Sequence, residues 1–162
     1  AVFHSDHYVE GWDQAGDPAL LHQHFKGQVP QVLRMLEKID VWKMWVLCDR
    51  EPVKDWSKGR ATLLGDAAHP MLQYLAQGAC MALEDAVCLA EKIEAKPNDI
   101  SAALLDYQNA RYLRTSRVQL MARVYGEAYH ARGPIAELRN NMLRARTPEQ
   151  AIEGIAWLYG GP

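Results

Sequence analysis

The sequence predicts an α+β chain that is mostly helical, with a few short strands. Apolar residues recur at helical spacing over residues 75–93, and a second helical stretch extends from about residue 99 to about residue 131. The runs 41–47 and 60–64 are short and apolar, as strands are. We therefore expect long helices in the second half of the chain and only remnants of sheets before them.

Composition and charge exclude several classes of protein. The chain has 162 residues, of which 49% are hydrophobic and 23% charged, as in a folded globular domain. Its 18 basic and 20 acidic residues give a net charge of −2, and no basic stripe carries stacking aromatic residues. No apolar run reaches the roughly 20 residues of a membrane span. We expect neither nucleic-acid binding nor a membrane span.

The cysteines favour a reducing compartment and no metal site. Cys48, Cys80 and Cys88 are odd in number and match no zinc-binding spacing. Free thiols fit the cytoplasm, which we expect as the location. Cys80 is interpreted as a small buried apolar residue, with a place beside a bound ligand as the alternative.

Two strands and two short helices are predicted in the amino-terminal part. Residues 1–4 have the pattern of a strand end, and the glycine-bearing residues 12–17 that of a loop. Helices are expected over 18–25, after a capping aspartate, and over 30–39. The aromatic and β-branched run 41–47 is expected to pair with residues 1–4.

A connector over residues 49–58 is expected to lead to a buried strand over 60–64. The helix over 75–93 should then bury one apolar stripe while its glutamates stay in water. This stripe comprises Leu75, Ala79, Leu83, Ala86, Val87, Ala90 and Ile93.

Three further helices are predicted after Pro97. Asn98 or Asp99 caps a helix of roughly 50 Å at 1.5 Å per residue, and the pair Gly133-Pro134 stops it. Shorter helices follow over 135–145 and 147–158.

The most informative motif reads Gly-Asp-Ala-Ala-His-Pro over residues 65–70, and a helix beginning at Gln77-Gly78 follows it. The motif places a carboxylate at the end of a strand, where α/β folds hold ligands. The next helix directs its free amides to the same place, which favours negative charge. The motif thus offers an acceptor for hydroxyl groups, a backbone that a ligand can approach closely, and a helix end that tolerates negative charge. These features suit a polyhydroxylated, redox-active ring cofactor.

These motifs resemble the second flavin-binding signature of the single-component FAD-dependent aromatic hydroxylases, the family of p-hydroxybenzoate and salicylate hydroxylases. Within it, the run Arg50-Glu51-Pro52-Val53 ahead of Trp56, together with residues 71–86, looks most like 3-hydroxybenzoate 6-hydroxylases. The resemblance covers nearly the whole chain but only the last two-fifths of such an enzyme. It implies a mostly helical fragment of an FAD/NAD(P)-binding α/β fold.

The glycine-rich βαβ turn that opens such enzymes is absent here, and the sequence begins at Ala1. We therefore expect a carboxy-terminal piece that is inactive without its amino-terminal half. The resemblance implies three segments: residues 1–58 from the substrate-binding domain, 59–97 with the flavin-binding motif, and 98–162 as a helical region. Arg111, Arg114 and Arg117 recur every third residue, and either pair with acids of the absent half or form a solvated face.

The resemblance implies a role for each residue of the motif. The Asp66 carboxylate would accept a hydrogen bond from a ribityl hydroxyl, with a plain turn residue as the alternative. The amides after Gln77 would face the flavin pyrimidine, and Pro70 would lie against the isoalloxazine ring. The implied cofactor-binding residues are Gly65, Asp66, Pro70, Gln77, Gly78 and Ala79.

Substrate contacts are implied for Gln73 and Tyr74, which lie between the flavin turn and the helix. His69 is interpreted as a structural histidine. No catalytic residue is identified, because the family takes its phenol-activating base from upstream strands. His4 and His7 are candidates, but we interpret them as surface residues.

The implied reaction uses NADH or NADPH to reduce FAD, and oxygen adds at flavin C4a to give a hydroperoxide that hydroxylates an aromatic hydroxy acid. The expected conversion is 3-hydroxybenzoate to gentisate, or else the hydroxylation of salicylate. The alternatives are another flavoenzyme of the superfamily (a halogenase, an isoprenoid reductase or a kynurenine-type hydroxylase) and a non-enzymatic helical interaction module. Exposed strand edges make a homodimer a further expectation.

Overall fold

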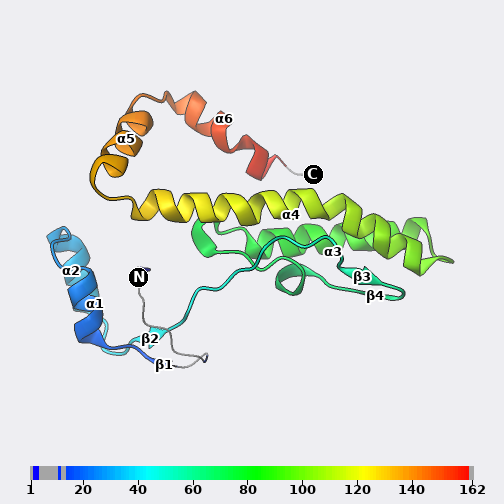
Figure 1. The fold of residues 1–162 in the computed structure, drawn as a ribbon, viewed down its shortest axis with the longest axis horizontal. Helices are drawn as coiled ribbons and strands as arrows, with labels where there is room; N and C mark the ends of the chain where they lie inside the picture. Colours follow the sequence, from blue (N-terminus) through cyan, green and yellow to red (C-terminus); the bar gives the residue numbers. More distant parts are fainter. Residues whose placement is uncertain (1, 4–10, 12–13, 161–162) are drawn as a thin grey trace. The chain divides into compact units, whose positions relative to one another are not determined.

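A computed structural model describes residues 2–3, 11 and 14–160 of the chain (Figure 1). The chain divides into two compact units, Ala1–Leu47 and Cys48–Pro162. Helices dominate, and the described strands form two small two-stranded sheets. The prediction of a mostly helical α+β chain is confirmed. The three functional segments divided at residues 58 and 97 stay a prediction.

The first unit contains a small antiparallel sheet and two short helices. Its elements are β1 (Gln14–Ala15), α1 (Pro18–His24), α2 (Pro30–Leu36) and β2 (Lys43–Met44). The Asp17 carboxylate accepts a 2.8 Å hydrogen bond from the Ala19 amide, which confirms the predicted cap of α1. Beyond Leu36 the chain continues to Ile39 in turns whose amides bond three residues back, so α2 is shorter than predicted.

Among the described residues, β2 pairs with β1, so part of the predicted loop over 12–17 is a strand instead. The predicted pairing of residues 41–47 with residues 1–4 stays a prediction. A 2.8 Å hydrogen bond from the Gly16 amide to the Trp42 carbonyl oxygen extends the ladder. With two residues, β1 is too short to show an alternating pattern in the sequence. The amino-terminal strand itself lies largely outside the described residues.

The second unit is built on two long antiparallel helices that lie side by side (Figure 1). Its helices are α3 (Gly78–Ala95), α4 (Ile100–His130), α5 (Gly133–Arg144) and α6 (Pro148–Tyr159). With 31 residues, α4 is about 46 Å long at 1.5 Å per residue. Asp99 caps it through a 3.0 Å hydrogen bond from the Ala102 amide to the carboxylate, as predicted.

The ends of the last helices follow local sequence signals. The long helix α4 ends at His130, just before Gly133-Pro134, as predicted. The same pair also begins α5, because proline is well tolerated in a first helical turn. Thr147 and Gln150 form a capping box at the start of α6, with side-chain to backbone hydrogen bonds of 3.2 and 3.0 Å.

A hairpin precedes the Gly-Asp motif. β3 (Ser57–Lys58) pairs with β4 (Ala61–Thr62) around Gly59. The amide oxygen of Gln108 on α4 accepts hydrogen bonds of 2.9 and 2.8 Å from the amides of Trp56 and Ser57, which fixes the hairpin to the helix. The prediction of a buried strand over 60–64 is wrong, since Leu63 and Leu64 are exposed and β3 is the only described strand that pairs with β4.

The face that α3 buries differs from the predicted one. Met81 and Asp85 are fully buried against α4, whereas Leu83 and Val87 of the predicted stripe are 69% and 61% exposed. Of the predicted stripe, Leu75 packs against a buried cluster and Ile93 is half-buried, while the other members are exposed. Periodicity missed the polar Asp85, whose burial depends on partners elsewhere in the chain.

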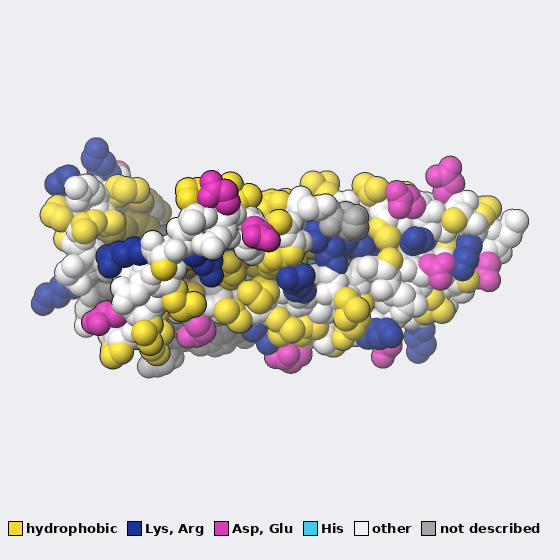
Figure 2. Space-filling model, turned by 90° about the horizontal axis from the view of Figure 1, so that it is seen from above, with side chains coloured by type: hydrophobic (Ala, Val, Ile, Leu, Met, Phe, Trp, Pro, Cys, Tyr) yellow, Lys and Arg dark blue, Asp and Glu magenta, His cyan; other side chains and the backbone are white. Residues whose placement is uncertain are grey.

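Two apolar clusters form the core of the second unit. Their buried members are Trp56, Ala68 and Tyr107 in one cluster, and Met81, Val118 and Leu158 in the other. Other apolar side chains, such as Ile135 and Leu138 of α5, stay at the surface, and hydrophobic atoms alternate with charged groups on the face shown in Figure 2. None of the helices in the described part of the chain has the length and hydropathy of a membrane span.

Candidate functional site

The Gly-Asp motif forms a single tight turn, η1 (Gly65–Ala67), just before His69. Gly65 has a φ of +59°, and a Cβ there would lie 3.2 Å from the Cβ of Ala82 on α3. Its carbonyl oxygen accepts hydrogen bonds of 2.9 Å from the amides of both Ala68 and His69. Glycine is therefore required here for its left-handed conformation and for close packing against the helix.

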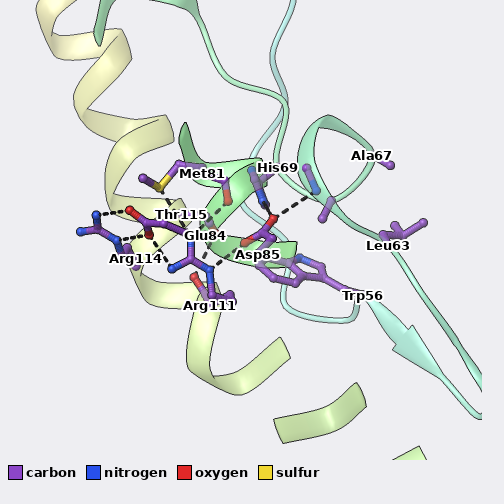
Figure 3. Close-up of polar contacts among 12 residues, drawn as sticks. Trp56, Leu63, Ala67, His69, Met81, Glu84, Asp85, Arg111, Arg114 and Thr115 are labelled. Carbon is purple, nitrogen blue, oxygen red and sulfur yellow. Dashed lines mark hydrogen bonds and ion pairs between the residues drawn. The ribbon is translucent and has the colours of Figure 1, made fainter. Parts of the chain in front are cut away.

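One buried carboxylate, that of Asp85, binds both the start of this turn and His69 (Figure 3). Asp85 Oδ2 accepts a 3.1 Å hydrogen bond from the Gly65 amide and lies 2.5 Å from Nε2 of His69. Its Oδ1 accepts a 2.7 Å bond from Nε of Arg111 on α4. Burial would raise the pKa of the Asp85 carboxyl, but the hydrogen bonds from His69 and Arg111 outweigh it and the pKa is lowered. Asp85 is thus ionised, and His69 donates through Nε2.

The ion pairs continue along the interface between α3 and α4. Glu84 Oε2 accepts from Arg111 Nη1 at 2.7 Å, and both Glu84 oxygens accept from Arg114 at 2.6 Å. The Arg114 hydrogen bond, supported by Arg111, lowers the pKa of Glu84 against the effect of burial. Arg114 also donates to the carbonyl oxygens of Trp157 and Leu158 at the end of α6.

The predicted solvated face is wrong for Arg111 and Arg114, which are buried and half-buried and pair with Glu84 and Asp85 of this chain. Arg117 is exposed, as a solvated face requires. The guanidinium of Arg117 lies 4.1 Å from the ring centroid of Trp157. The recurrence of arginine opposite the adjacent acids Glu84 and Asp85 was the signal that could have predicted these pairs.

Arg50 and Gln119 hold the carboxyl-terminal end of the turn through its carbonyl oxygens. The Arg50 guanidinium donates to the carbonyl oxygens of Ala67 and Ala68, the latter at 2.9 Å. Gln119 of α4 donates to the carbonyl oxygen of half-buried Pro70 at 2.9 Å. Residue 50 belonged to a family motif without an assigned role, and the structure shows that it holds the backbone of the turn.

Asp66 projects from this fixed turn into solvent. Its carboxylate is exposed and accepts no hydrogen bond from the described residues. A Cβ on Gly78, the first residue of α3, would lie 3.7 Å from Asp66 Oδ1, so the carboxylate lies beside the helix start. Gln77 is buried next to it, and Ala79 is exposed. The predicted cofactor residues Asp66, Gln77 and Gly78 thus lie together, and their role stays a prediction.

The other predicted site residues lie as follows. His69 is 1% exposed and paired with Asp85, in keeping with its structural interpretation. Gln73 is exposed on η2 (Gln73–Leu75), while Tyr74 is half-buried against α4. The interpretation of Cys80 as a buried residue is wrong, because its side chain is exposed in the first turn of α3. His4 and His7 lie outside the described residues.

Metal ligation finds no support in the part of the chain that the structure describes. Within it, no group of three or more His, Cys, Asp or Glu side chains is arranged to hold a metal ion. Cys48, Cys80 and Cys88 are free thiols. The site instead combines an unpaired acceptor on Asp66 with backbone donors at the start of α3, which suits an uncharged polyol beside an electron-rich group.

Comparison with known proteins gives a consistent result. The family described as FAD binding domain matches residues 3–122. A 3-hydroxybenzoate 6-hydroxylase of Polaromonas naphthalenivorans (strain CJ2) is 43% identical over 159 residues, which cover 98% of this chain and 40% of that protein.

Two solved structures share the fold. Klebsiella pneumoniae HpxO complexed with FAD and uric acid superposes with a TM-score of 0.78 and 32% identity, covering 90% of this chain and 38% of that one. A salicylate hydroxylase substrate complex gives a TM-score of 0.77 and 29% identity, covering 100% of this chain and 38% of that one. The chain therefore spans about two-fifths of the length of these relatives.

Proposed function

Because this chain belongs to the family described as FAD binding domain, we propose that residues 65–79 hold the ribityl chain and the pyrimidine end of FAD in an aromatic hydroxylase. The single observation that carries the proposal is the exposed, unpaired carboxylate of Asp66 on a turn whose other side is fixed by Asp85 and Arg50. A free acceptor on an immobile backbone is what an oriented hydrogen bond to a ligand hydroxyl requires.

Each residue of the turn has a distinct task in this proposal. Asp66 accepts from a ribityl hydroxyl, and Gly65 allows the backbone to approach without a side chain in the way. The first amides of α3, at Gly78 and Ala79, donate toward the ring where negative charge develops. Pro70 offers an apolar wall without an N–H group. When bound, FAD would supply the transfer of electrons from NADH or NADPH and the activation of oxygen.

The substrate that we propose is a hydroxybenzoate, with 3-hydroxybenzoate converted to gentisate as the first choice and salicylate as the second. The similarity to 3-hydroxybenzoate 6-hydroxylases and to a salicylate hydroxylase supports this choice. Gln73 is exposed on the segment between the flavin turn and α3, and its amide can donate to or accept from a polar ring substituent.

The activity belongs to the complete protein in this proposal. The chain covers about two-fifths of the length of its relatives. We propose that the pyrophosphate site and the phenol-activating base come from a part of the complete protein outside residues 1–162. We propose that residues 1–162 alone do not turn over substrate.

The experiment uses the complete polypeptide that contains these residues. It is purified, scanned for flavin absorbance, and incubated with oxygen, NADH or NADPH, and 3-hydroxybenzoate, salicylate or urate; the products are identified by chromatography. Gentisate from 3-hydroxybenzoate supports the proposal. Bound FAD without any hydroxylated product indicates another flavoenzyme of the superfamily, and failure to take up FAD indicates a helical interaction module.

A further inference from the structure

Near the end of α4, the ring of Tyr74 packs against the backbone of Gly126. Gly126 is buried, and a Cβ there would lie 2.6 Å from Cε2 and 2.7 Å from Cδ2 of that ring. Real Cβ atoms do not approach so closely, so no other residue fits this position without moving Tyr74. Glycine inside a helix costs about 1 kcal/mol relative to alanine, which indicates that the space itself is needed.

Two side chains of the same helix enclose the ring. Tyr129 and His130 meet Tyr74 edge to face, with centroid distances of 6.1 and 5.5 Å. His130 Nδ1 lies 2.9 Å from the Gly126 carbonyl oxygen, which fixes one wall of the notch. Burial, and then the nearby Glu127 carboxylate, raise the pKa of Tyr74, so its phenol stays neutral. Tyr74 therefore sits in a notch formed by Gly126, Tyr129 and His130.

The segment that carries Tyr74 is conformationally strained. Ala76 has a φ of 52°, and it is the only described residue other than glycine with a positive φ. Its amide donates a 2.8 Å hydrogen bond to the Gln73 carbonyl oxygen, which closes the turn. A left-handed alanine persists only where the surroundings hold it, and such strain concentrates at functional sites. The adjoining residues are exposed Gln73 on one side and buried Gln77 on the other.

We propose that Gly126 is a positioning residue for the aromatic substrate. By seating Tyr74 it fixes the turn over residues 73–76, and this turn presents the Gln73 amide to the substrate. Tyr74 acts as a wedge rather than as a substrate contact. The inference rests on the proposed function, because it assigns the substrate side of the same site, but it concerns residues of α4 that lie outside the Gly-Asp motif.

The test compares two helical glycines in the complete, FAD-loaded protein. Gly126→Ala forces the Tyr74 ring out of its notch, whereas Gly154→Ala on α6 is a matched control, since the nearest atom to its Cβ is 3.9 Å away. For Gly126→Ala we expect the KM for the hydroxybenzoate to rise roughly tenfold or more, with a smaller change in kcat. Product formed per NAD(P)H oxidised should fall, and FAD per chain should stay unchanged. Gly154→Ala should match the wild type.

A double variant separates steric displacement from other effects. Tyr74→Leu removes the ring, so Gly126→Ala should add no further rise in KM on that background. A Gly126→Ala enzyme with wild-type KM and coupling overturns the inference, as does a loss of FAD with unchanged KM. If Gly126→Ala does not fold, Tyr74→Leu decides alone: a raised KM with retained FAD supports the inference, and a wild-type KM overturns it.

Failure of the proposed function would be recognised separately. If the wild-type protein hydroxylates no aromatic acid, the substrate assignment fails, and a crystal structure of Gly126→Ala then decides the positioning role. A displaced Gln73–Leu75 turn supports that role, and an unchanged turn overturns it.

Discussion

Asp85 of α3 and Arg111 of α4 form a fully buried ion pair, with 2.7 Å between Oδ1 and Nε. The other oxygen of the same carboxylate binds the Gly65 amide and His69. One side chain thus joins the contact between the two long helices to the turn that carries Asp66. Stability and the geometry of the proposed cofactor site are therefore coupled in this protein.

Replacing Asp85 by Asn should destabilise the protein strongly. The change removes one of the two carboxylates, Asp85 and Glu84, that compensate buried Arg111, and breaking a buried pair from one side costs about 3–5 kcal/mol. Urea unfolding of the complete protein measures the loss. Asp106→Asn is the control, because its ion pair with Lys96 is more than two-fifths exposed on both sides and contributes at most about 1 kcal/mol. Equal losses for the two variants would contradict the importance of the buried pair.

Acid should remove the contribution of Asp85 to stability. Its folded-state pKa lies below the unfolded value of about 3.9, so the unfolded state binds more protons in that range. The contribution is complete above about pH 4 and is lost as the pH falls through the lowered pKa. We expect the difference in unfolding free energy between wild type and Asp85→Asn to shrink on acidification from pH 7. If the unfolding free energies of the two proteins changed in parallel with pH, the Asp85 carboxylate would not titrate as described.

Gly65→Ala should destabilise the protein more than Gly59→Ala, although both glycines have nearly the same φ, +59° and +61°. Both variants introduce the left-handed strain of about 1–2 kcal/mol. Only at residue 65 does the new Cβ also meet the Ala82 Cβ at 3.2 Å, while residue 59 is open. Thermal unfolding and FAD content of the two variants give the comparison. A larger effect at residue 59 would show that close packing against α3 is unimportant.

Asp66→Ala should weaken FAD binding without weakening the fold. A lost charge-assisted hydrogen bond corresponds to a Kd roughly ten- to a hundredfold higher. The side chain is exposed and has no hydrogen-bond partner among the described residues, so unfolding of the FAD-free protein should change by less than about 0.5 kcal/mol. Flavin titration measures the affinity, with Asp40→Ala, another exposed aspartate, as the control. An unchanged Kd would remove Asp66 from the cofactor site.

Local sequence determined those features that depend on hydrogen bonds within a few residues. The caps at Asp17, Asp99 and Thr147 follow from side chains that reach amides two or three positions ahead. The tight turn at Gly65 likewise follows from its local motif, because few residues tolerate its φ. For the same reason the helices were located to within a few residues.

Only the tertiary structure decided which faces and charges meet. The sequence could not show that α3 buries Asp85 rather than Leu83, because a charge is buried only where a distant partner such as Arg111 compensates it. Nor could it show that Gly126 makes room for Tyr74, since the two lie 52 positions apart in the chain. Periodicity identifies an apolar stripe, but the free energy of burial depends on what the rest of the chain brings against it.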